Sequence, residues 1–560
     1  MRWQIAAYHR FWNRRFAFSR ANRPEELWND GAVISVAPRW RGGARRFADR
    51  LAGVDATRAA MVLVGLLGLA LALFQLSRTG ALYGVTEYDD GPYFGSAVML
   101  AHGYLPYRDF GFSMMPGITL LMAPVATVAR LVGTRVGIAI ARLVTAVVAG
   151  ANCTLAGAIV RHRGASAVLL AGGLLACYPS AVFADHTVLL EPYLSAFCLV
   201  SFLLAFTGTG ELTRRRALVA GCALGFAGDI KVWAIFVAVP AVVIMAISAR
   251  PRVRAYMTGI VLGFAVPALP FFLAAPTAMV RDNLALLVLR GRTYENGLTY
   301  RLSVTLGTWY RSLYTPSALF TWTILGVVAA VIVLGYAFYL RRTTPGEWLV
   351  LGSAATTATA LLAAPQFYPH HVYFAYVFIA PALAVASANL VKSAASWLGR
   401  ARLRLERVTY AVLSAALVGS LLIVAAAVVV PGDLANDTAL LSVHDFGPTI
   451  AATIPAGSCA ISDDPIELIA ANRYVSNDPN CPKIADPEAL EVEIDGRVNY
   501  TAPPGDRVTA TWISWFSRAR YVLITGSSGQ RIPWSPTLVH WFTAHFRLLN
   551  RAGIWKRIGG

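Results

Sequence analysis

Long runs of apolar residues alternate with short polar segments along most of the chain. An α-helix needs about 20 such residues to cross a membrane, and the first run extends from Ala59 to Leu76. Further runs fall near residues 136–160, 164–183, 187–208, 215–230, 231–249, 255–276, 317–340, 347–364, 371–391 and 408–430. The pattern therefore predicts a polytopic α-helical membrane protein with about eleven transmembrane helices.

The segment from Pro116 to Val132 decides the topology, because it is long enough either to span the membrane or to lie on its surface. Lys and Arg are enriched in cytoplasmic loops, and only the surface position puts the later basic clusters inside. These clusters are Arg161/Arg163, Arg214 to Arg216, Arg250/Arg252/Arg254, Arg341/Arg342 and Lys392 to Arg407. We therefore expect a cytoplasmic N-terminus, an extracytoplasmic C-terminus, and a first outer loop (80–135) with two surface helices.

The two ends of the chain differ from the apolar part. Residues 1–58 are rich in arginine and contain no run long enough to span, which predicts a basic cytoplasmic tail. After Pro431, acids and bases nearly balance, and β-like runs (459–462, 520–524) alternate with helix-like ones (538–550). We expect residues 431–560 to form a small extracytoplasmic α/β domain, with 59–430 as the transmembrane domain.

Composition supports this class of protein. The chain has 560 residues, of which 56% are hydrophobic and 14% charged, whereas soluble domains usually carry about 25% charged residues. The net charge of +19 comes from basic residues between apolar runs, so membrane topology accounts for it and we predict no nucleic-acid partner. The sequence has no Gly-x-x-x-x-Gly-Lys-Ser/Thr loop, no Gly-x-Ser-x-Gly elbow and no His-Glu-x-x-His, which argues against an ATPase, a serine hydrolase of that type and a zincin.

The six cysteines fall into two groups. Four lie singly within apolar helices, where they suit packing: Cys153, Cys177, Cys198 and Cys222. Cys459 and Cys481 lie in the predicted extracytoplasmic domain. Because that compartment is oxidising, we expect them to form a disulfide.

An acidic stretch, Thr86-Glu-Tyr-Asp-Asp-Gly-Pro-Tyr93, follows the first apolar run. The first outer loop thus places four carboxylates at the membrane surface, Glu87, Asp89, Asp90 and Asp109. Pro92 suits the first turn of a helix, which Gly103 would end. An aspartate here either serves the chemistry or merely caps that helix.

The other predicted outer loops also collect polar residues. They hold Asp185-His186, Arg281, Arg290 and Arg292 in the 277–316 loop, and the segment from Gln366 to His371. They also hold Asp229 and Lys231, whose spacing of two residues suggests an ion pair. One explanation is a shared site on the outer face. The alternatives are that loops are simply polar, that Lys231 snorkels to the interface, that the arginines bind lipid headgroups, and that the histidines are interfacial residues with no ligand.

The motifs in these loops resemble those of the GT-C superfamily of membrane glycosyltransferases, especially protein O-mannosyltransferases and lipid A aminoarabinose transferases. They are Asp89-Asp90-x-x-Tyr93, Gly103-x-x-Pro106-Tyr107-x-Asp109, Pro116-Gly117, Glu191-Pro192, Gly225-x-x-x-x-x-Lys231 and Phe367-Tyr-Pro-His370-His371. The resemblance covers roughly residues 59–391. The family usually has Asp-Glu at Asp89-Asp90 and Pro-Pro at Met115-Pro116, which leaves the subfamily and the sugar open.

The resemblance implies a plasma-membrane enzyme that passes a sugar from a polyprenyl-phosphate donor in the bilayer to an outer glycan, lipid or protein acceptor. Asp89 matches the position of the family's catalytic aspartate, and Asp90 is its neighbour. A carboxylate that is partly desolvated beside another carboxylate is a suitable base for a hydroxyl nucleophile. We expect the donor phosphate to be bound by Lys231, Arg290, Arg292, His370 and His371. We assign substrate binding to Asp109, Tyr93, Asp185, His186 and Glu191.

No cofactor is predicted. Some GT-C relatives use a divalent ion, and Asp89, Asp185, His186 or His370 could contribute to such a site, but their spacing matches no coordination motif. The functional alternatives are a flippase of lipid-linked saccharides, for which we find no internal repeat, and a GT-C-like assembly partner without activity. The high Ala, Val, Arg and Gly content resembles actinobacterial proteins, in which decaprenyl-phosphate mannose or arabinose would be the donor.

Overall fold

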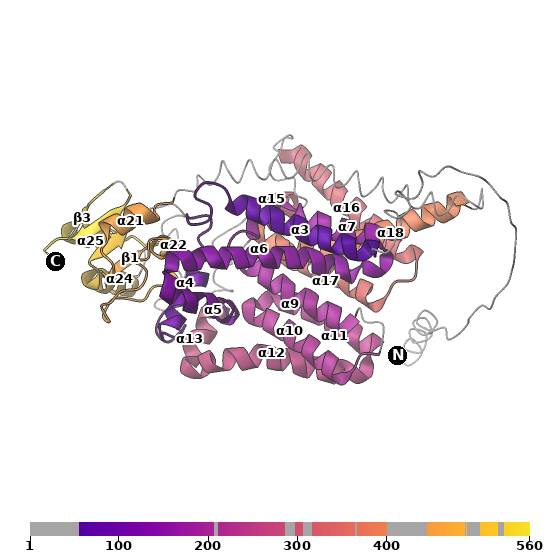
Figure 1. Ribbon diagram of the computed structural model, residues 1–560, viewed down its shortest axis with the longest axis horizontal. Coiled ribbons are helices and arrows are strands. Elements are labelled where there is room, and N and C mark those ends of the chain that lie inside the picture. The colour runs from indigo at the N-terminus through magenta and orange to yellow at the C-terminus, as the bar shows by residue number, and fades with distance from the viewer. Residues whose placement is uncertain are drawn as a thin grey trace, which may run out of the picture.

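The structure is a computed structural model that describes residues 55–206, 211–285, 297–305, 316–364, 367–399, 445–487, 489, 505–524, 531–550 and 552–559. A bundle of long helices forms most of it (Figure 1). The bundle helices are α3 (Ala56–Leu76), α6 (Thr134–Ile159), α7 (Ala165–Ala176), α9 (Leu190–Phe206), α10 (Arg214–Ile230), α11 (Ile235–Ser248), α12 (Val253–Ala274), α16 (Pro316–Leu340), α17 (Pro345–Ala363) and α18 (Val372–Gly399). The chain is a multi-pass membrane protein.

Four described helical segments are long and apolar enough to cross a membrane on their own: Ala56–Leu76, Thr134–Ile159, Arg250–Ala274 and Pro369–Trp397. The other bundle helices match the predicted runs in position, although α7, α9 and α11 are shorter than predicted. The predicted run 164–183 is broken after Ala176, because Pro179 begins the separate helix α8 (Pro179–Ala184) and holds Tyr178 in an extended conformation. The predicted span 408–430 lies outside the described residues, so the expected count of eleven is not established.

Helices α10 and α12 pack with their backbones in close contact. Gly221 and Gly225 on α10 face Gly259 and Gly263 on α12, and each pair has the Gly-x-x-x-Gly spacing that membrane helices use for close approach. A Cβ atom added at Gly263 would lie 2.1 Å from the carbonyl oxygen of Cys222. Only glycine therefore allows this crossing, which fixes the position of the α10 end that carries Lys231.

At one end of the bundle, basic side chains meet a buried glutamate. Arg163 Nε lies 2.5 Å and His162 Nε2 2.9 Å from Glu347 Oε1, and Thr344 with Glu347 forms a capping box at the start of α17. Arg163 also donates to Asn389 Oδ1 of α18 at 2.8 Å. The short connection between α6 and α7 is thereby held against α17 and α18.

The opposite end of the bundle carries two further helices, α4 (Asp90–Ala101) and α5 (Gly117–Val132), beside the C-terminal domain (Figure 1). These two helices occupy the segment predicted to form surface helices. Thr134 at the start of α6 donates to the carbonyl of Ile469 at 2.7 Å, and Arg135 lies 2.5 Å from Asp445. The C-terminal domain is thus docked on the loop end of the bundle.

The described part of the C-terminal domain combines a four-stranded sheet with short helices. Its sheet has the order β1 (Ala460–Ser462), β2 (Tyr521–Leu523), β4 (Ile554–Arg557) and β3 (Phe546–Leu548), with β1–β2 parallel and the other pairs antiparallel. The helices are α21 (Gly447–Thr453), α22 (Pro465–Ala470), α24 (Asp506–Arg518) and α25 (Pro536–His545). The predicted helix-like segment 538–550 ends as a helix at His545 and continues as strand β3. Cys459 and Cys481 form a disulfide.

Candidate functional site

Asp90 is fully buried in a hydrogen-bond network that fixes the acidic loop, by which we mean residues 86–93. One carboxylate oxygen accepts from Arg142 Nη2 at 2.5 Å and from Nε at 3.0 Å, and the other accepts from the backbone N–H of Val188. Arg142 also donates to the carbonyls of Ala81 and Gly84 at 2.8 and 2.9 Å. Removing one partner of a buried ion pair costs about 3–5 kcal/mol, so Asp90 positions the loop and its carboxylate is already committed to Arg142.

Asp89 has a different environment, although it is the adjacent residue. Its side chain is partly buried and accepts a hydrogen bond from the hydroxyl of Tyr93 at 3.2 Å. The residue precedes α4 directly, but its side chain makes no capping hydrogen bond to that helix. A cap role therefore does not explain this aspartate, and its carboxylate is oriented by Tyr93.

Glu87 lies beside the two aspartates and is also partly buried. Burial, and then the negative charges of Asp89 and Asp90, raise the pKa of its carboxyl to about 8, although the positive charge of Arg531 opposes the shift. Arg531 comes from the C-terminal domain, and its guanidinium lies 4.3 Å from the ring centroid of Tyr88. The C-terminal domain thus brings a positive charge to the acidic loop.

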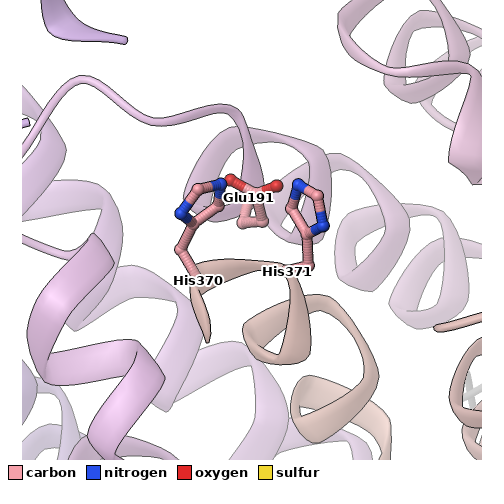
Figure 2. Close-up of side chains that lie close together, drawn as sticks. All are labelled: Glu191, His370 and His371. Atoms are coloured by element: carbon pink, nitrogen blue, oxygen red, sulfur yellow. The ribbon is translucent and has the colours of Figure 1, made fainter. Parts of the chain in front are cut away.

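A second cluster lies where three bundle helices begin or end. Lys231 Nζ is 2.6 Å from Glu191 Oε1 and 4.2 Å from the ring centroid of Trp233. The rings of His370 and His371 are 4.6 Å apart at 89°, and Trp233 packs edge-on against His371 at 4.5 Å. Figure 2 shows the Glu191 carboxylate between the two imidazoles. The sequence suggested Asp229 as the partner of Lys231, but the structure pairs this lysine with Glu191.

The helix ends explain how these side chains meet. Glu191 is in the first turn of α9, where the positive end of the helix dipole favours a carboxylate. Lys231 follows the last residue of α10, where the negative end of the helix dipole favours a cation. His370 and His371 form a 3₁₀ turn that begins at Pro369 and leads into α18. Three separate segments therefore direct polar groups to one place.

The two clusters are neighbours. Asp89 is close enough to His370 for their charges to interact, as are Glu191 and Lys231. Phe183 stacks beside His370 at 6.3 Å and packs edge-on to His186 at 6.4 Å. The Asp89 carboxylate, which can accept a proton, thus lies beside the cluster of Lys231, His370 and His371, which can bind an anion.

The remaining predicted residues have varied positions. His186 is buried, and its Nδ1 lies 2.9 Å from the carbonyl of Val182, while Asp185 is buried beside Tyr373. Asp109 accepts from the N–H of Leu105 and pairs with Arg108, both at 2.7 Å. Arg290 and Arg292 lie outside the described residues.

The pKa of Asp109 is lowered by the groups that surround it in its loop. Partial burial would raise it, but the hydrogen bonds from Arg108 and Leu105 and the charges of Arg108 and Lys483 lower it overall. Asp109 is therefore an ionised group that holds the loop at Leu105, and Lys483 of the C-terminal domain contributes to its environment.

Comparison with known proteins gives structural similarity only. The sequence matches no protein-family model and no curated protein. The structure is similar to several solved structures. ArnT from Cupriavidus metallidurans bound to undecaprenyl phosphate is 16% identical, with a TM-score of 0.48 over 73% of this chain and 85% of that chain. An oligosaccharyltransferase from Archaeoglobus fulgidus is 13% identical, with a TM-score of 0.46 over 83% of this chain and 68% of that chain.

Both TM-scores are below 0.5, so neither similarity identifies the function of this chain.

Proposed function

We propose that the protein is a glycosyltransferase that transfers a sugar from a polyprenyl-phosphate-linked donor to an acceptor at the extracytoplasmic membrane surface. The observation that carries this proposal is the juxtaposition of Asp89 with the cluster of Lys231, His370 and His371. The first supplies a base and the second a site for a phosphate leaving group. The absence of a nucleotide-binding motif from the sequence fits a donor dissolved in the bilayer.

In this reaction each group has a separate task. Asp89, held by Tyr93, takes the proton of the acceptor hydroxyl as the oxygen attacks the anomeric carbon of the donor. Lys231, oriented by Glu191, and the two histidines stabilise the negative charge that grows on the leaving phosphate. Asp90 holds Asp89 in place through Arg142. We assign substrate binding to Asp185 and His186, the latter beside Phe183, which also packs against His370.

The same proposal includes the orientation of the chain. The end of the bundle with the acidic loop and the C-terminal domain faces outward, and the end with Arg163 and Glu347 faces the cytoplasm. ArnT is described as bound to undecaprenyl phosphate, and the Archaeoglobus enzyme AglB as in complex with dolichol-phosphate. A donor of the same chemical class, carrying mannose or arabinose, is what we propose for this chain.

Sugar transfer from a synthetic polyprenyl-phosphate donor by the purified protein tests the proposal. Asp89→Asn keeps the shape of the side chain but removes its basicity, so turnover should fall by about 10²- to 10⁴-fold while donor affinity changes little. Asp506→Asn, at an exposed aspartate of the C-terminal domain, is the matched control and should retain the wild-type rate.

Other results would point to another function. Equal turnover of Asp89→Asn and wild type would exclude Asp89 as the base. Movement of the donor across vesicle membranes, without sugar transfer by any form, would support a lipid-linked saccharide flippase instead. If depletion of the protein in cells causes loss of envelope glycan, and wild type and Asp89→Asn restore it equally, the protein would be a non-catalytic assembly partner.

A further inference from the structure

Glu191, His370 and His371 have the arrangement of a metal site. One potential ligand atom from each residue lies within 4.8 Å of the others, and their exposures are only 1%, 6% and 7%. In Figure 2 a ring nitrogen of each histidine is directed toward the carboxylate between them. The three donors therefore converge on one small volume from two separate segments of the chain.

The chemistry of the donors favours a particular class of ion. Two imidazole nitrogens and one carboxylate oxygen form the set that Zn²⁺ takes in many catalytic sites, where the fourth position stays open. Mg²⁺ and Ca²⁺ prefer sites built from oxygen atoms. We propose that Glu191, His370 and His371 bind one divalent transition-metal ion, best fitted by Zn²⁺, whose open position takes a phosphate oxygen of the donor.

Neighbouring aromatic rings already hold the two histidines in place. His371 packs against the edge of Trp233 at 4.5 Å, and the ring of His370 stacks with that of Tyr368 at 5.6 Å. Pro369 starts the turn that carries both histidines. Imidazoles fixed in this way lose little freedom when an ion binds, which supports binding over a set of mobile surface histidines.

Lys231 provides an internal test, because it competes with the ion. Its Nζ lies 2.6 Å from Glu191 Oε1, so a bound cation must share this carboxylate with the ammonium and is repelled by its charge. Replacing Lys231 with methionine removes the competitor and keeps an apolar stem. Zn²⁺ affinity should then rise, whereas a cluster that is only a packed ion pair would gain no affinity.

This inference deepens the proposed function, since the ion would assist the phosphate leaving group, but its test needs no sugar donor. The full-length protein in detergent is stripped with a chelator, loaded with Zn²⁺, dialysed, and its metal content measured by mass spectrometry. We expect about one Zn²⁺ per chain, as a single three-ligand site requires. Glu191→Gln and His371→Ala should each weaken binding by no less than about tenfold, since even the loss of an outer-shell partner commonly has that effect.

The matched control is His162→Ala. His162 also contacts a buried glutamate, Glu347, at 2.9 Å, but this pair belongs to no group of three ligands among the described residues. Its loss should leave the Zn²⁺ content unchanged. If a ligand variant does not fold, titration of Lys231→Met with Co²⁺ replaces it, and the visible spectrum of a tetrahedral Co²⁺ site should appear at lower Co²⁺ than in wild type.

Retention of no Zn²⁺ by the loaded wild type, or equal retention by wild type and both ligand variants, would overturn the proposal. Unchanged affinity in Lys231→Met would do the same. The proposed function fails separately: Zn²⁺ bound as expected without sugar transfer by any form would remove the transferase and leave the metal site, and full transfer by stripped protein would show that the ion is not needed.

Discussion

Asp89 and Asp90 are chemically identical neighbours, and their surroundings give them different tasks. Asp90 is enclosed with Arg142, whereas Asp89 is partly exposed and contacts Tyr93. The sequence identified the pair but not the division between them, because Arg142 lies on another helix and matches no motif. Contacts between distant segments, and not spacing, decide which carboxylate can act as a base.

The raised pKa of Glu87 predicts an effect of pH on stability. In the unfolded chain this carboxyl loses its proton near pH 4.5, but in the folded loop only near pH 8. The folded state therefore holds an extra proton between these values. The contribution of Glu87 to stability is complete below pH 4.5 and is lost as the pH rises toward 8.

Glu87→Gln keeps a neutral side chain at every pH and should avoid this loss. The melting temperature of the variant should therefore rise relative to that of wild type as the pH increases from about 4.5 to 8. Thermal unfolding of the detergent-purified proteins at a series of pH values measures the difference. Glu211→Gln, at an exposed glutamate, should follow wild type throughout, and a Glu87→Gln curve parallel to wild type would contradict the prediction.

Individual residues also show which parts of the candidate site the sequence could predict and which it could not. Lys231, Glu191 and the two histidines were identified from motifs, but the pairing of Lys231 with Glu191 was not, since the nearer Asp229 seemed the natural partner. Arg531 was missed entirely. It lies in the C-terminal domain without any recognisable pattern, and only the docking of that domain brings it to Tyr88.

Helical elements were easier to predict than their contacts. Runs of apolar residues mark membrane helices because the backbone must satisfy its own hydrogen bonds in lipid, so α3, α6 and α12 fall close to their expected bounds. The break between α7 and α8 was missed, although Pro179 was its local signal. Hydropathy is averaged over a window and does not register one residue that interrupts a helix.

The contact between α10 and α12 gives a prediction at this scale. In Gly263→Ala the new methyl would lie 2.1 Å from the carbonyl oxygen of Cys222, so the helices must separate, at a cost of about 1–3 kcal/mol as for other overpacked sites. Because α10 carries Lys231 at its end, donor affinity should fall as well. Thermal unfolding and donor titration measure the two effects.

Gly326 of α16 provides the control. A Cβ atom there would meet no described atom within 4 Å, and alanine is a better helix former than glycine by up to about 1 kcal/mol. Gly326→Ala should therefore leave the protein as stable as wild type or more so. If both alanine variants behaved alike, close backbone packing would not be what holds α10 against α12.

For the whole molecule, topology is the property that can be tested most directly. Cysteines introduced at Ser166 or Thr343 lie near Arg163 and Glu347, at the end we expect in the cytoplasm. An impermeant thiol reagent should label them only after the cells are opened. Asp478→Cys, exposed on the C-terminal domain, should be labelled in intact cells. Labelling of Ser166→Cys in intact cells would show that the chain has the opposite orientation in the membrane.

The docking of the C-terminal domain has a consequence for biosynthesis. The carboxylate of Asp486 accepts from the hydroxyl and the backbone N–H of Ser113, and Arg531 reaches the acidic loop. Ser113 and the acidic loop are translated long before Asp486 and Arg531. A nascent or truncated chain that ends before Asp486 and Arg531 cannot make these contacts. Under the proposed function, we therefore expect sugar transfer to begin only after both residues have been synthesised.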